Sequence, residues 1–117
     1  MDVLDDHEEN GIVTFGLTGT LDLYNSPEVK GRFNDWYEKG FKKFLIDLSG
    51  LDHVDSSGLA AFINWHSFLQ EREGRSVLFG ARGGVKRILE LTDLNQRIFI
   101  VGHRDQALRI LEKLKPV

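Results

Sequence analysis

The chain has 117 residues, of which 41% are hydrophobic and 28% charged, which is enough for one compact domain and too little for two. Cysteine is absent, which excludes disulfides, a thiolate nucleophile and any cysteine-based metal site. The net charge of −3 provides no global basic field for direct nucleic-acid binding.

The first ten residues, MDVLDDHEEN, are rich in acids. This acidity favours a solvated, frayed segment, whereas the apolar pair Val3-Leu4 favours an antiparallel edge strand, and both interpretations stay open. The segment has neither the basic nor the apolar region of a secretory signal. No apolar stretch in the chain approaches the roughly 18 residues of a membrane span. We therefore expect a cytoplasmic protein without membrane insertion.

The first strand is predicted over Gly11–Leu17, GIVTFGL, because β-branched and aromatic residues dominate it. Thr18-Gly19-Thr20 is expected to end it. Ser26-Pro27-Glu28 then predicts a helix start, with serine as N-cap, proline at the first helical position and an acid in the first turn. Gly40 is a natural stop for this helix. Its apolar residues follow at helical spacing: Val29, Phe33, Trp36 and Tyr37.

A second strand is predicted over Phe44–Leu48, FLIDL, followed by a turn at Ser49–Asp52. The second helix follows Asp55-Ser56-Ser57-Gly58 and stops near Gly74. Its buried face is expected to hold Leu59, Phe62, Ile63, His66 and Leu69.

The last third of the chain predicts two more strands, Ser76–Phe79 and Ile98–Val101, each followed by a helix. The third helix is lined by Val85, Ile88, Leu89 and Leu91. Asp105 is the expected cap of the final helix, which carries Leu108, Leu111 and Leu114.

Strands and helices thus alternate four times along the chain. Strands joined through helices form parallel, right-handed crossovers, so the expected fold is α/β, with alternating helices on a mixed, mostly parallel β-sheet. No linker or repeat interrupts the pattern, and we expect residues 1–117 to form a single domain.

Two catalytic motifs are considered and set aside. The glycine loop Gly80–Gly84 lacks the spacing of a phosphate-binding loop, because Lys86 does not directly follow a glycine and Arg87 stands where a hydroxyl is needed. Ser56 and Ser57 lack the flanking glycines of a hydrolase nucleophile. Histidines and acids show no metal-ligand spacing. We therefore expect no enzyme activity and no cofactor.

The segment Asp55-Ser56-Ser57-Gly58 has two readings. In the first it is an ordinary helix cap. In the second it is a functional site, because it follows a buried strand at the carboxyl end of a parallel sheet, where α/β folds place their sites. A helix N-terminus offers free amides to a phosphate, and phosphorylation would add about 1.5–2 negative charges there.

The segment FLIDLSGLDHVDSSGLAAFINW resembles the core of STAS domains, specifically that of bacterial anti-sigma factor antagonists. The resemblance runs nearly end to end and implies a STAS-like fold. It is carried by five segments in order: Leu17–Asp22, Ile46–Ser49, Asp55–Leu59, Val85–Leu94 and Ala107-Leu108.

This resemblance implies a partner-switching protein of transcription regulation and signal transduction. Unphosphorylated, it would sequester an anti-sigma factor that is also a serine kinase and so release a sigma factor. The kinase would phosphorylate Ser56, making this chain a phosphoprotein, and a serine phosphatase would reverse the reaction. The other residues implied in partner binding are Asp22, Asp55, Ser57, Gly58 and Leu59. A second reading is a regulatory or structural STAS subunit of a larger sensory or transporter complex. A homodimer is left open.

Overall fold

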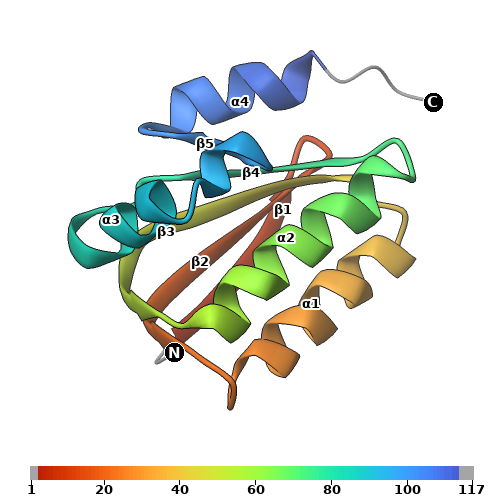
Figure 1. The fold of residues 1–117 in the computed structure, drawn as a ribbon. Helices are drawn as coiled ribbons and strands as arrows, with labels where there is room; N and C mark the ends of the chain where they lie inside the picture. Colours follow the sequence, from red (N-terminus) through yellow and green to blue (C-terminus); the bar gives the residue numbers. More distant parts are fainter. Residues whose placement is uncertain (1–2, 114–117) are drawn as a thin grey trace.

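A five-stranded sheet with the order β1-β2-β3-β4-β5 lies at the centre of the molecule (Figure 1). The computed structural model describes residues 3–113. β1 pairs antiparallel with β2, and all other neighbouring strands are parallel, which confirms the expected mixed, mostly parallel α/β fold. The strands are β1 (Val3–Glu9), β2 (Ile12–Leu21), β3 (Lys43–Val54), β4 (Arg75–Phe79) and β5 (Phe99–Val101).

Helices cover both faces of this sheet (Figure 1). α4 packs on one face, where Ala107 and Leu111 join a small core with Leu45, Val77 and Phe79. The other face carries α1, α2 and α3 and the larger core, which includes a cluster of Phe15, Phe33, Phe44 and Trp65. The helices are α1 (Ser26–Glu38), α2 (Ser56–Gln70), α3 (Gly83–Leu91) and α4 (Arg104–Glu112), with a 3-10 turn η1 (Leu94–Gln96) before β5.

Two strands run further than the sequence predicts. Thr18-Gly19-Thr20 does not end β2, and Ser49–Asp52 is strand instead of turn. The reason is mutual pairing: Thr18–Leu21 of β2 lies beside Gly50–Val54 of β3, with two register shifts. Gly50 permits the close approach, because a Cβ there would lie 2.6 Å from Thr18 Cγ2. Because both strands are extended, β2 and β3 end side by side, with Leu21 paired to Val54.

Smaller corrections concern helix ends and faces. The N-cap position of α1 is Asn25 instead of Ser26, without a side-chain capping hydrogen bond, and that of α4 is His103 instead of Asp105. His103 takes the capping position because its amide donates to Gln106 Oε1 at 3.1 Å, as in a capping box. Leu91 is the last residue of α3, but it is 72% exposed and does not lie on the buried face of the helix. Leu114 lies outside the described residues.

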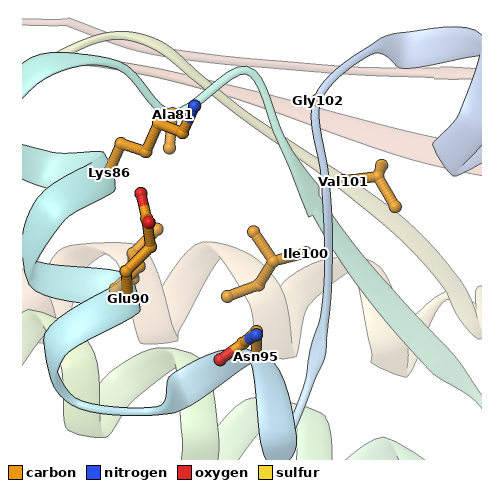
Figure 2. A pocket seen from close by; sticks show the side chains of 8 residues that line it. Ala81, Lys86, Glu90, Asn95, Ile100, Val101 and Gly102 are labelled. Atoms are coloured by element: carbon orange, nitrogen blue, oxygen red, sulfur yellow. The ribbon is translucent and has the colours of Figure 1, made fainter.

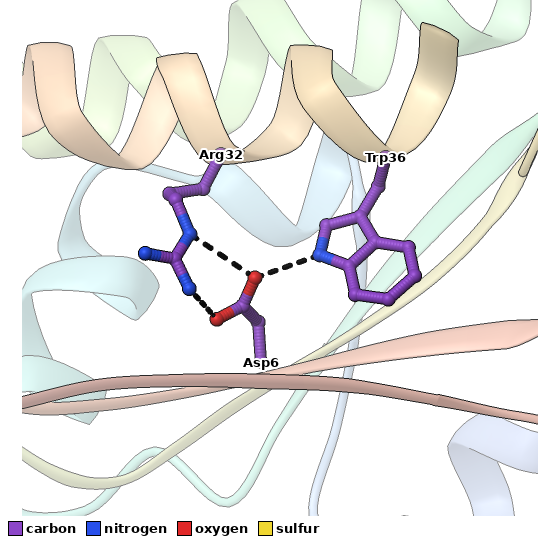
Figure 3. A network of polar contacts seen from close by, with 3 residues as sticks. All are labelled: Asp6, Arg32 and Trp36. Carbon is purple, nitrogen blue, oxygen red and sulfur yellow. Dashed lines mark hydrogen bonds and ion pairs between the residues drawn. The ribbon is translucent and has the colours of Figure 1, made fainter. Parts of the chain in front are cut away.

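The edge strand β1 is joined to α1 by a buried carboxylate. Asp6 accepts hydrogen bonds from Trp36 Nε1 at 2.7 Å and Arg32 Nε at 3.1 Å, and it forms an ion pair with the same guanidinium (Figure 3). Its side chain is only 6% exposed. Burial alone raises the pKa of Asp6, but the hydrogen bonds from Arg32 and Trp36 and the charge of Arg32 outweigh it, so the net pKa lies below 3.8.

We expect the Asp6 network to make stability depend on acid pH. The folded-state pKa is lowered, so the contribution of Asp6 is fully present above the ordinary value of 3.8 and is lost as the pH falls through the folded-state pKa. Asp6→Asn should lower the free energy of unfolding at pH 7, and its deficit should shrink at pH 3. Urea denaturation of both proteins at the two pH values measures this. Asp5→Asn, at an exposed position on the same strand, is the matched control; a deficit of Asp6→Asn that is the same at both pH values would contradict the expectation.

Candidate phosphorylation and docking site

The paired ends of β2 and β3 bring two loops together at the start of α2 (Figure 1). One loop is Asp22–Asn25, between β2 and α1, and the other is the turn at Asp55. The Asp55 amide donates to the Leu21 carbonyl at 3.1 Å, extending the contact between the strands by one residue.

Asp55 is the N-cap of α2 and also holds the neighbouring loop. Its backbone is extended, and Oδ1 accepts from the Gly58 amide at 3.1 Å. Oδ2 accepts from the Leu23 amide at 3.2 Å. Both carboxylate oxygens are therefore engaged, and the two loops form one connected surface.

Ser56 is the first residue of α2 and is exposed, whereas Ser57 and Leu59 are half-buried. The first amides of a helix have no intrahelical partner and form the positive end of its macrodipole. The hydroxyl of Ser56 is thus accessible to a modifying enzyme, at a helix end that is electrostatically suited to a phosphate.

Gly58 lies under this surface. It is buried, and a Cβ on it would lie 2.5 Å from Val54 Cγ2 and 2.9 Å from Leu21 Cγ. Such distances are too short for any side chain. Gly58 therefore lets the first turn of α2 rest directly on the ends of β2 and β3.

Asp22 shapes the neighbouring loop. Its carboxylate accepts from the amides of Tyr24 at 2.9 Å and Asn25 at 3.3 Å. Asn25 in turn accepts from the Asp22 amide and donates to the Thr20 carbonyl at 2.7 Å. Asp22 thus orders a loop that the Leu23 amide joins to Asp55.

Two residues of this loop escaped the sequence analysis. Leu23 is 66% exposed and Tyr24 is 92% exposed, although both are large and apolar. No periodic pattern includes them, since they stand in a loop. The signal available was an apolar pair between Asp22 and Asn25, two residue types typical of turns.

One histidine, on the same helix as Ser56, is buried. His66 on α2 is buried, with Nδ1 3.5 Å from Ser76 Oγ. Burial, reinforced by the nearby Arg75 charge, lowers the pKa of His66 despite the opposing effect of a hydrogen bond with the Ser76 backbone. Within residues 3–113 no group of three or more His, Asp or Glu side chains could hold a metal ion. In the same described part of the chain, no helix is both long enough and apolar enough to cross a membrane.

A separate hollow of about 270 Å³ lies between α3, η1 and β5. Lys86 and Glu90 of α3 and Asn95 of η1 surround it, with Ile100 at one side (Figure 2). None of the predicted site residues lines it. The glycine-rich loop that the sequence analysis set aside contributes Ala81 to its rim.

A family model described as the STAS domain matches residues 4–114. The chain therefore belongs to the STAS domain family. An anti-sigma-B factor antagonist of Listeria monocytogenes is 32% identical over 84 residues, which cover 72% of this chain and 74% of the relative. This confirms the resemblance to the anti-sigma factor antagonists.

Solved structures agree on the fold. A Thermotoga maritima protein assigned as an anti-sigma factor antagonist superimposes with a TM-score of 0.86 at 22% identity, covering 94% of this chain and 95% of that one. The phosphorylated form of the Bacillus cell fate determinant SpoIIAA gives a TM-score of 0.71 at 15% identity, covering 92% and 98%.

Proposed function

We propose that this protein is an anti-sigma factor antagonist that works as a phosphorylation-controlled binding module. Unphosphorylated, it binds an anti-sigma factor that is also a serine kinase, and a sigma factor is thereby released. The kinase phosphorylates Ser56 with its own ATP and magnesium, and a serine phosphatase reverses the step. The protein itself is a cytoplasmic non-enzyme that holds no cofactor.

The observation that carries this proposal is the position of Ser56. It is an exposed hydroxyl at the first position of α2, directly after an N-cap carboxylate that also holds the adjacent loop. Support comes from the Listeria relative, an anti-sigma-B factor antagonist, and from the shared fold of SpoIIAA, which exists in a phosphorylated form.

The switch follows from electrostatics at a preformed surface. A phosphate on Ser56 adds about 1.5–2 negative charges next to Asp55. The end of α2 favours these charges, whereas the neighbouring carboxylate opposes them. Since Asp55 already bonds the Gly58 and Leu23 amides, the loops keep their arrangement. The added charge therefore acts mainly on the approaching partner.

Ser56→Ala is expected to abolish phosphorylation by the partner kinase and to leave the fold intact. The N-cap is Asp55, so the substitution removes no capping hydrogen bond from α2. Ser57→Ala is the matched control and should be phosphorylated like the unaltered protein. Mass spectrometry after incubation with the kinase and ATP measures the incorporation and maps it. Full phosphorylation of Ser56→Ala, with the label on Ser57, would show that Ser57 and not Ser56 is the acceptor. Absence of phosphorylation of the unaltered protein would overturn the proposed switch.

A further inference from the structure

The apolar pair Leu23 and Tyr24, called here the Leu-Tyr tip, is unusual for its exposure. Among the described residues, four large hydrophobic side chains are exposed, and the other two, Leu91 and Phe99, stand apart from each other in the sequence. Leu23 and Tyr24 are adjacent in the sequence, and 66% and 92% of their surfaces are exposed to water. Neither side chain belongs to the core, so packing within the molecule does not explain an apolar residue at either position.

The backbone of the tip is nevertheless held firmly. The Leu23 amide donates to Asp55 Oδ2, and the Tyr24 amide donates to Asp22 Oδ1. Asn25 closes the loop through its hydrogen bonds with the Asp22 amide and the Thr20 carbonyl. A fixed backbone that presents exposed apolar side chains has already lost much of the entropy that binding would otherwise cost.

The chemistry of the tip indicates the kind of surface that it fits. Its side chains are apolar, and the two carboxylates beside it, Asp55 and Asp22, already accept hydrogen bonds from the Leu23 and Tyr24 amides. A complementary surface on the partner would hold an apolar pocket. Tyrosine is enriched among residues that dominate binding energy, especially where a polar rim excludes water around it.

We infer that the Leu-Tyr tip is the apolar anchor by which the anti-sigma factor kinase binds this protein, inserted into an apolar pocket of the kinase. The inference rests on the proposed function. The tip and Ser56 share one surface, because Asp55 bonds the Leu23 amide and precedes Ser56 directly. A kinase that reaches the Ser56 hydroxyl therefore approaches the tip as well. The anchor supplies affinity, and Ser56 supplies the charge that reverses it.

The test replaces the tip side chains and leaves the acceptor in place. Leu23→Ala/Tyr24→Ala should raise the Kd for the kinase about tenfold or more, as expected when anchor side chains are truncated. The amides that hold the loop are unchanged, and circular dichroism should show an unaltered fold. Leu91→Ala removes an equally exposed leucine from the end of α3 and should change the Kd less than about twofold. Calorimetry with the purified kinase measures all three proteins.

Phosphorylation kinetics provide the second readout. The double variant should show a raised KM for the kinase, with kcat much less affected, because Ser56 and its cap are intact. If the unaltered protein binds the kinase and the double variant binds equally well, the anchor is refuted while the proposed function stands. Equal weakening by Leu91→Ala would also refute it, since the effect would then be general to exposed apolar residues. If the unaltered protein neither binds the kinase nor is phosphorylated, the proposed function fails and the anchor with it.

Discussion

Phosphorylated Ser56 is expected to weaken binding to the anti-sigma factor kinase by about a hundredfold or more. Docking would desolvate the phosphate where the unmodified protein has an uncharged hydroxyl, and a charge that is desolvated without an opposite charge commonly costs several kcal/mol. Ser56→Asp should weaken binding less than the phosphate, because aspartate adds one charge and lacks the phosphate geometry. The expected order of affinity is unmodified, Ser56→Asp, then phosphorylated.

Calorimetry on these three forms measures the order, and circular dichroism verifies that each is folded. Ser57→Asp offers a comparison, since it adds the same charge one residue further along α2 at a half-buried position. Equal affinity of the unmodified and phosphorylated proteins for the kinase would refute the switch mechanism, even if Ser56 is the acceptor. A loss that disappears at about 0.5 M salt would indicate a screened, long-range effect instead of a contact at Ser56.

Gly58→Ala is expected to destabilise the fold by about 1–3 kcal/mol, the usual cost of overpacking. The new Cβ would meet Val54 Cγ2 at 2.5 Å and the Leu21 side chain at 2.9 Å, so the first turn of α2 would have to move away from the strand ends. The helix propensity of alanine offsets only part of this cost. Because Asp55 caps this turn and holds the Leu23 amide, the displacement should also disturb the docking surface.

Urea denaturation compares this variant with Gly31→Ala as the control. Gly31 lies within α1, and a Cβ there would have nothing within 4 Å, so alanine should stabilise by about 0.5–1 kcal/mol. The two substitutions are chemically identical and are expected to act with opposite sign. A Gly58→Ala protein as stable as the unaltered one would show that the strand ends yield to the methyl group at no cost.

Much of the architecture could be predicted because it depends on local patterns. The alternation of apolar strands and amphipathic helices indicates parallel crossovers whatever the details of packing. Asp55 could be proposed as a cap of α2 because capping involves an aspartate and amides two or three residues away. Ser56, next in the sequence, then falls at the start of the helix by helix geometry alone.

The sequence by itself therefore determined the fold class and the start of α2, and its resemblance to the anti-sigma factor antagonists made Ser56 the candidate acceptor. Only the tertiary structure decided how far β2 and β3 extend, because the hydrogen bonds of Thr18–Leu21 and Gly50–Val54 come from each other across about thirty intervening residues. It alone buried Asp6 against Arg32 and Trp36. It also joined the Leu23 amide to Asp55, since a hydrogen bond between residues 32 positions apart leaves no periodic trace in the sequence.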